Sequence, residues 1–397
     1  MQRGRTGRIA RLTAILAAAA LTVALAPSAA AQEADPAPSV PPGPPLQEPE
    51  AVRDAALRCP EDLGPGDRAV LLVHGTALTA DTNFAWGYEP ALTAQGFAVC
   101  LVDLLEAGMG DNQLSAERVV HAVRRMHEAT GTEISIVGYS QGGQVPRWAL
   151  RWWPDLWPMV DDLVTLSAPN NGALFADGLC AIPCAAAAWQ QRMFGSRYIA
   201  ALNTEPTSFP GIDITSVYTR LDEIATPNLL AQSSHLPGAT NIATQDICPA
   251  NVAEHLLLGT VDAVGFALVV DALTHDGPAD PARIPRSVCT QLFLPGLSPL
   301  DALLGLTKVA LQIPQSLLAA PLLPAEPPLG CYVTASCPPA EEPAPEAEAS
   351  EGAADEAEDE TVDAEPSPSP AASSPSAAPA TREPLGLLGV LLRGLLG

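Results

Sequence analysis

The segment GYSQGG at positions 138–143 constrains the fold more than any other feature of the chain. An unbroken apolar run at 134–137 precedes it, and a helical pattern begins near Gln141. A direct turn from a strand into a helix needs glycines, because side chains there would collide with the neighbouring backbone. The turn lifts the hydroxyl of Ser140 out of the sheet edge, which predicts Ser140 as a nucleophile. The competing interpretation is a tight turn whose serine only caps the helix.

Apolar runs bounded by turn residues alternate with helical patterns along the chain, which predicts βαβ units around a mostly parallel central sheet flanked by helices. We expect strands at 69–73, 97–102, 134–137, 163–166, 214–218 and 240–243. Between the second and third strands, Ser115 is positioned to cap a helix that ends at Gly131. The fold class is therefore α/β.

The N-terminal residues predict export. Four arginines precede an apolar run of 15 residues at 12–26, and three alanines at 29–31 offer a cleavage site. A membrane-spanning helix needs about 20 apolar residues, so we expect a signal peptide at 1–31 rather than an anchor. Residues 32–50, rich in Pro, Ala and Glu, then form a flexible lead-in. The expected location is extracellular or at the cell surface.

Charge is concentrated in one segment near the C-terminal end. Twelve acids and no bases lie between Glu341 and Glu365, in a stretch dominated by Ala, Pro and Ser. We expect 339–384 to be a disordered tail, because it lacks the apolar residues that offset the entropy of ordering. A short leucine-rich segment, 385–397, follows it. The formal net charge of -25 makes nucleic acid an improbable partner.

The remaining body, 51–338, is long enough for one core and contains no fixed-period repeat, which predicts a single catalytic domain. We also expect a monomer. The mature chain holds eight cysteines, and an exported protein meets oxidising conditions. Four disulfides are therefore plausible, although 105 pairings are possible. A zinc site is disfavoured because no histidine adjoins the close pairs Cys180/Cys184 and Cys331/Cys337.

A serine nucleophile needs a base, and the base needs an orienting carboxylate. In chain order these follow the serine, each on a loop after a later strand. Asp222 lies just beyond the strand 214–218, with Glu223 as the neighbour that could replace it. His255 lies beyond the strand 240–243 and is the predicted base. The alternatives are His235, which precedes that strand, and His275, which lies in a later turn.

The tetrahedral intermediate of acyl transfer also needs hydrogen-bond donors around its oxyanion. The residue after the nucleophile, Gln141, supplies one backbone donor, and the loop at 74–76 after the first strand supplies the other. The alternative is that 74–76 form an ordinary turn.

Apolar side chains are available for a substrate pocket. Phe175, Ile182 and Trp189 are candidates for its wall, although each could equally belong to the core. The apolar segment 297–323 is interrupted by prolines, so we expect a pair of short helices on the core or an apolar rim over the pocket.

With these residues in place, the chain resembles the Candida antarctica lipase B-like family of serine lipases over nearly the whole body. The matching segments, in order, are VHGT at 73–76, YSQGG at 139–143, LSAPNNG at 166–172, WQQ at 189–191, DEI at 222–224 and the interval 248–255. The resemblance implies an α/β-hydrolase fold and an oxyanion hole in which Thr76 donates from both its backbone and its hydroxyl beside Gln141.

The same resemblance implies three bridges, Cys59–Cys100, Cys248–Cys289 and Cys331–Cys337. The chain also departs from the family pattern. Cys180 and Cys184 are additional and would pair with each other, Glu254 stands where the family has Asp, and Pro146 falls in the helix after the serine. The acidic tail has no family counterpart.

The combined prediction is a secreted serine ester hydrolase that acts on apolar or lipid esters without a metal or organic cofactor and makes transient contact with a lipid interface. Two other enzymatic hypotheses use the same triad: an acyltransferase, and a polyester or cutin hydrolase. A hypothesis of a different class is an inactive, hydrolase-like binding protein.

Overall fold

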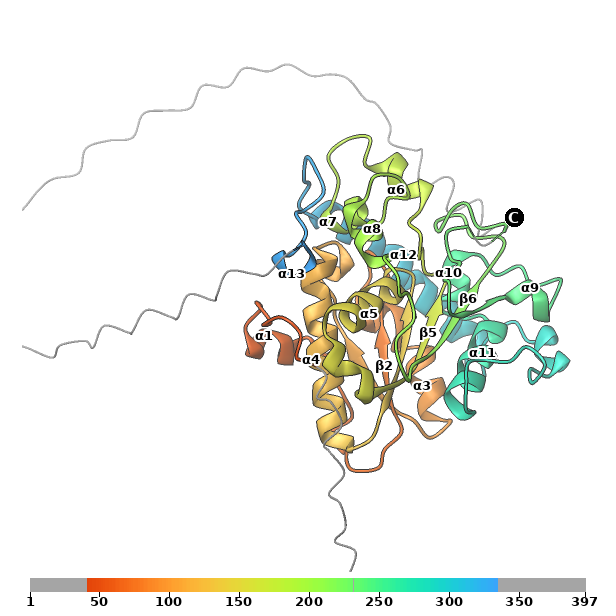
Figure 1. Ribbon diagram of the computed structural model, residues 1–397. Helices are drawn as coiled ribbons and strands as arrows, with labels where there is room; N and C mark the ends of the chain where they lie inside the picture. The colour runs from red at the N-terminus through yellow and green to blue at the C-terminus, as the bar shows by residue number, and fades with distance from the viewer. Residues whose placement is uncertain (1–40, 231, 335–397) are drawn as a thin grey trace, which may run out of the picture. The chain divides into compact units, whose positions relative to one another are not determined.

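Figure 1 shows the computed structural model, which describes residues 41–334 apart from residue 231. Seven strands form one sheet in the order β1-β3-β2-β4-β5-β6-β7. The short β1 pairs antiparallel with β3, and every other neighbouring pair is parallel. The strands are β1 Leu57–Arg58, β2 Ala69–Val73, β3 Ala98–Val102, β4 Ile134–Tyr139, β5 Val160–Leu166, β6 Asp213–Tyr218 and β7 Thr240–Ala243.

Helices lie on both faces of the sheet and in the loops at its edges. The longer helices are α4 Asn112–Thr130, α5 Gln141–Trp152, α11 Ala263–Thr274 and α12 Pro299–Ala319. The shorter ones are α1 Glu50–Ala55, α2 Ala80–Phe84, α3 Tyr88–Thr93, α6 Leu174–Leu179, α7 Ala186–Gln190, α8 Arg197–Leu202, α9 Thr244–Ile247, α10 His255–Leu258 and α13 Cys331–Thr334. The 3₁₀-helices are η1 Leu105–Gly108, η2 Pro154–Met159 and η3 Arg286–Thr290.

Strand β2 shows why both faces of the sheet are covered. Its five residues are all buried, and successive side chains point to opposite faces. Val70 and Leu72 belong to the apolar cluster formed with α2, α3 and α11. Leu71 and Val73 belong to the cluster formed with α4 and α5, which lie side by side in Figure 1. A strand buried on both faces reads as a continuous apolar run, as β2 does.

The predicted α/β fold with a mostly parallel sheet is confirmed, and all six predicted strands are present. The antiparallel β1 was not predicted, because two residues carry no alternation pattern. The prediction that Ser115 caps the helix after β3 is wrong. The cap is Asp111, whose carboxylate accepts a hydrogen bond from the backbone N–H of Gln113 at 2.8 Å. The helix ends as predicted at Gly131, which has a φ of 68°.

The prediction of two short helices at 297–323 is also wrong, because one helix, α12, covers 21 residues. Pro299 occupies its first turn, where the missing N–H is not needed, and Ser298 caps it. Pro314 removes one internal hydrogen bond without ending the helix, and Pro321 lies beyond the last turn.

By length and composition alone, two described segments could cross a membrane. In the segment 255–274, 78% of the most apolar stretch is buried, whereas in α12 only 22% of the most apolar stretch is buried. The first is therefore explained by the core of the domain. The core does not explain the exposed leucines of α12.

Three disulfides are present in the described residues: Cys59–Cys100, Cys180–Cys184 and Cys248–Cys289. They are consistent with a protein of an oxidising compartment. Cys337, the expected partner of Cys331, lies outside the described residues, as do the predicted signal peptide, residues 32–40 of the lead-in, the acidic tail and the apolar segment 385–397. The domain boundaries drawn from the sequence remain predictions.

The glycine at 142 provides a test of the packing between α5 and β2. A methyl group there would collide with the backbone carbonyl of Val73. We therefore expect Gly142→Ala to lower the free energy of unfolding by about 2–3 kcal/mol or to prevent folding, as in other overpacked interiors. The matched control is Gly178→Ala, an exposed position in α6 with no atom within 4 Å of the added methyl. Thermal melts that show equal stability for both variants would contradict this packing argument.

Candidate active site

Ser140 lies between β4 and α5 in a backbone conformation that few residues adopt, with φ of 54° and ψ of -120°. The turn is held by two backbone hydrogen bonds, from Ser140 N to Leu166 O at 2.8 Å and from Gly143 N to Ser140 O at 2.9 Å. The glycines at 138 and 142 approach each other so closely that a methyl on Gly138 would collide with the Gly142 carbonyl. Packing therefore enforces the strained turn that presents the hydroxyl.

The structure brings Ser140, His255 and Asp222 into one hydrogen-bonded line. His255 Nε2 lies 3.0 Å from Ser140 Oγ. His255 Nδ1 lies 2.9 and 3.0 Å from the two carboxylate oxygens of Asp222. All three residues are buried, with exposed fractions of 5%, 5% and 7%. Since a carboxylate only accepts, Nδ1 donates to Asp222, which leaves Nε2 free to accept from the serine hydroxyl.

Local structure holds the Asp222 carboxylate in place. The residue follows β6 by a few positions, and its Oδ1 accepts from the backbone N–H groups of Ile224 at 3.0 Å and Ala225 at 2.6 Å. These bonds fold the loop around the side chain, which leaves the carboxylate oriented toward the imidazole. An aspartate can make this turn because its side chain reaches the backbone two and three residues ahead.

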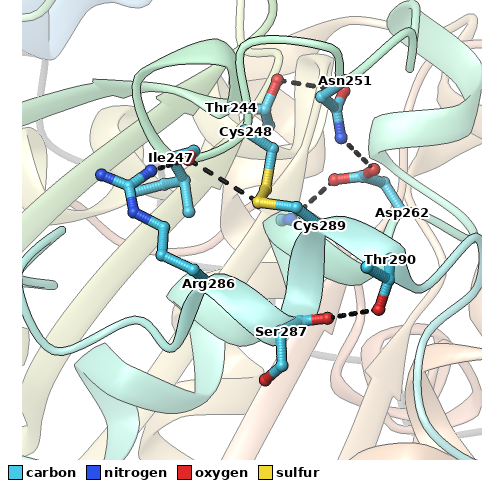
Figure 2. The surroundings of a disulfide bond; sticks show 10 residues. Thr244, Ile247, Cys248, Asn251, Asp262, Arg286, Ser287, Cys289 and Thr290 are labelled. Atoms are coloured by element: carbon cyan, nitrogen blue, oxygen red, sulfur yellow. Dashed lines mark hydrogen bonds between the residues drawn. A yellow bond between two sulfur atoms is a disulfide. The ribbon is translucent and has the colours of Figure 1, made fainter.

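His255 begins α10, in a loop that follows β7 and α9 and is tied at both ends. Figure 2 shows the Cys248–Cys289 bridge at the start of this loop. Close by, the amide of Asn251 donates to the Asp262 carboxylate at 2.7 Å. Asp262 in turn caps α11 through a 2.7 Å bond from Gly265 N. The segment that carries the imidazole is therefore closed by one covalent and one polar contact.

Burial and charge act in opposite directions on the two titratable groups. Burial alone would lower the pKa of His255, but the Asp222 carboxylate stabilises the imidazolium and raises it above the ordinary value of 6.5. Burial alone would raise the pKa of Asp222, but His255 and the backbone N–H of Ala225 hold it below 3.8. The pair thus favours a charged carboxylate next to an imidazole that readily accepts a proton.

The loop after β2 lies against the serine, where the sequence predicts the oxyanion donors. The hydroxyl of Thr76 contacts the side-chain amide of Gln191, whose Nε2 donates to it at 3.0 Å. Gln141 is the first residue of α5, where a backbone N–H has no acceptor within the helix. His74 is fully buried: its Nδ1 donates to Gly75 O, and its Nε2 accepts from Leu104 N at 2.9 Å. This histidine fixes the loop and lies outside the triad.

A network of buried amides, which no pattern in the sequence predicts, supports this loop. Gln141 Nε2 donates to Asn112 Oδ1 at 2.5 Å, and Asn112 N donates to Gln190 Oε1 at 2.7 Å. Asn83 is fully buried, accepts from Gly75 N at 3.2 Å and donates to Gly259 O at 3.1 Å. The matched segment at 189–191 was the only signal of such a role, because isolated amides carry no spacing pattern.

The alternatives to the triad residues lie elsewhere. His235 and His275 are exposed, and His275 pairs loosely with Asp271 at 3.5 Å. Glu223 is next to the site, but its carboxylate accepts from the backbone N–H of His255 at 3.2 Å and makes no contact with the imidazole. Within the described residues, no group of three or more His, Cys, Asp or Glu side chains is arranged to hold a metal ion.

The three predicted pocket residues lie around the α6–α7 segment. Phe175 is 40% exposed on α6, and Ile182 is 70% exposed inside the Cys180–Cys184 loop. Trp189 is partly buried on α7, and its indole N–H donates to Leu323 O at 3.0 Å. Their contact with a substrate remains a prediction.

No family model matches the chain. Among curated proteins, lipase B from Pseudozyma antarctica is 28% identical over 219 residues, which are 53% of this chain and 64% of that protein. A triacylglycerol lipase from Pseudarthrobacter phenanthrenivorans is 30% identical over 115 residues, 27% of this chain and 35% of that protein. The chain thus matches less than two thirds of the length of these relatives.

Among solved structures, Aspergillus fumigatus lipase B superposes with a TM-score of 0.68 at 29% identity, over 74% of each chain. In its fold, in these relatives and in the segments quoted above, the chain is similar to lipase B-like α/β-hydrolases.

Proposed function

We propose that this protein is a secreted serine carboxylic-ester hydrolase, a triacylglycerol lipase or lipase-like esterase, with Ser140, His255 and Asp222 as its catalytic triad. The observation that carries the proposal is the line from Ser140 Oγ through the imidazole to the Asp222 carboxylate, with contacts of 3.0 and 2.9 Å. Three such groups in hydrogen-bond reach, in this order, form the arrangement that activates a serine.

The chemistry follows from the geometry. His255 Nε2 takes the proton of Ser140 as Oγ bonds to the ester carbonyl carbon, and Asp222 stabilises the resulting imidazolium. The imidazolium then protonates the alcohol oxygen as its bond to the acyl carbon breaks. Water enters, gives a proton to Nε2 and attacks the acyl-enzyme, and release of the acid returns the proton to Ser140. Each step uses only side chains of this chain and water.

The negative charge that develops on the carbonyl oxygen needs donors already in place. We assign this role to the backbone N–H of Gln141 and to the backbone and hydroxyl of Thr76. The contact between the Thr76 hydroxyl and Gln191 supports the assignment, because it fixes the threonine side chain before substrate arrives. Phe175, Ile182 and Trp189 are proposed to border the substrate.

An apolar substrate class is supported by the surface as well as by the relatives. On α12, Leu300, Leu303, Leu304, Leu311 and Leu318 expose between 53% and 88% of their area. A row of exposed leucines on one helix is unusual for a monomeric protein in water and is typical of a surface that meets lipid. We therefore propose transient contact with a lipid interface, made by a monomer.

Replacement of the nucleophile tests the enzymatic proposal. We expect Ser140→Ala to lower hydrolysis of p-nitrophenyl esters by about 10⁴-fold or more while the melting temperature stays near that of the wild type. A fluorophosphonate should label the wild type at Ser140 and leave the variant unlabelled. Folded wild-type protein that neither hydrolyses esters nor reacts with the probe would support the binding-protein hypothesis, and ester products formed from an added alcohol would support the acyltransferase.

The proposed oxyanion donor has its own test. Thr76→Val keeps the shape of the side chain but removes the hydroxyl, so we expect kcat to fall by about 10²-fold with KM little changed. Thr76→Ser keeps the hydroxyl and should retain most of the activity. Equal rates for the two variants would remove the hydroxyl from the mechanism.

The raised pKa of His255 predicts how activity depends on pH. Only the neutral imidazole can accept the serine proton, so kcat/KM should fall as the pH drops through a value above 6.5. Asp222→Asn removes the charge that stabilises the imidazolium, so the acid limb should move to lower pH while kcat drops by about 10⁴-fold. An acid limb below pH 6.5 in the wild type would contradict the electrostatic assignment.

A further inference from the structure

Each of the two partners in the His255–Asp222 contact has a glutamate as its chain neighbour, and both glutamates converge on the start of α10. Glu223 Oε2 accepts from the backbone N–H of His255 at 3.2 Å. Glu254 accepts from the next two N–H groups, those of Leu256 at 2.7 Å and Leu257 at 3.2 Å. The first three backbone donors of α10 therefore all bond to carboxylates. This is more negative charge than at the starts of α4 and α12, where one side chain caps the helix by accepting from a single N–H.

Apart from the imidazole of His255, the charged groups near Glu254 are carboxylates. Asp222 and Glu223 lie in the loop after β6. The uncharged ring of Tyr139, at the end of β4, packs on the His255 ring at a centroid distance of 5.2 Å. Within the described part of the chain, neither glutamate forms an ion pair with an arginine or lysine. Among the described residues, compensation of these carboxylates thus falls to the imidazole, whose charge lowers the pKa of Glu254.

The two glutamates differ in exposure. Glu223 is exposed, so water screens its charge, whereas Glu254 is partly buried. Burial, reinforced by the Glu223 charge, raises the pKa of Glu254 to about 7. Glu254 therefore exchanges its proton near neutral pH, and its titration is linked to that of His255 because each charge changes the cost of forming the other.

We propose that Glu254 is a positioning residue that, with Glu223, sets the pH at which His255 becomes a base, in addition to capping the helix that presents the imidazole. The inference rests on the proposed function. When Glu254 loses its proton, its charge stabilises the imidazolium, so His255 gives up its own proton only at a higher pH. The carboxylates thereby restrict the hydrolase to neutral and alkaline conditions.

The test compares the acid limb of kcat/KM in three variants on a soluble p-nitrophenyl ester. Glu254→Gln keeps an oxygen that can cap α10 but removes the charge, so the limb should move to lower pH by about one unit, with the plateau rate changed by less than about threefold. Glu254→Asp keeps the charge and should retain the wild-type limb. Glu133→Gln, an exposed carboxylate just before β4 and thus at the opposite end of that strand from Ser140, controls for the loss of one charge.

The outcomes separate this inference from the proposed function. Wild-type protein that fails to hydrolyse esters or to react at Ser140 contradicts the hydrolase itself. If the wild type is active but its acid limb is the same as that of Glu254→Gln, only the role of Glu254 is contradicted. If Glu254→Gln lowers the melting temperature without shifting the acid limb, Glu254 caps the helix and does nothing more.

A second measurement covers the case in which Glu254→Gln does not fold. In wild-type protein labelled with ¹³C at glutamate carboxyls, the Glu254 signal should titrate near pH 7. Glu223→Gln, at an exposed position, should lower that midpoint and shift the acid limb of kcat/KM in the same direction as Glu254→Gln, by a smaller amount. Titration of Glu254 near its ordinary value of 4.5 would overturn the inference.

Discussion

The hydrogen bond between the buried Asp222 carboxylate and the His255 imidazole is the interaction on which the rest of the site depends. A charge removed from water costs several kcal/mol unless new donors replace its hydration. Two backbone N–H groups and the imidazole do so here, and they come from loops separated by 33 residues. A parallel sheet can bring such loops together because the carboxyl ends of its strands share one edge. The topology of β4, β6 and β7 is thus a requirement of the chemistry.

Backbone strain gathers at the same edge. Among the described non-glycine residues, five have a positive φ: Ala77, Glu106, Ala107, Ser140 and Ser167. They lie on the loops that follow β2, β3, β4 and β5, and each such conformation costs about 1–2 kcal/mol. The fold tolerates this cost because the packing of the buried strands and of helix α5 restricts the loop backbones to these conformations. The packing that imposes these conformations holds the Ser140 hydroxyl and the Thr76 loop in place before a substrate binds, and electrostatic catalysis needs such preorganisation.

The sequence predicted the parts of the molecule that depend on local patterns. Continuous apolar runs located the six parallel strands, and the glycines around Ser140 located the turn. Prediction failed where tertiary contacts decide between local options. Ser115 has the chemistry of a cap, but the turn that Asp111 closes extends α4 by one turn toward its N-terminus. Pro314 is a residue that usually ends a helix. In α12 the helix continues past it, and the face that includes the buried Val309 packs on the core.

The amide of Asn83 shows why such residues escape a sequence analysis and why they matter. Its Oδ1 accepts from Gly75, in the proposed oxyanion loop, and its Nδ2 donates to Gly259, just after the helix of His255. This fully buried side chain thus joins the loop after β2 to a backbone carbonyl 176 residues further along the chain than Asn83. Aspartate would place a second acceptor against the Gly259 carbonyl, and leucine would leave both backbone groups unpaired, at about 1–3 kcal/mol each. A side chain of this length with one donor and one acceptor keeps the proposed oxyanion donors in register with the proposed base. The local sequence around position 83 contains no pattern that would predict this role.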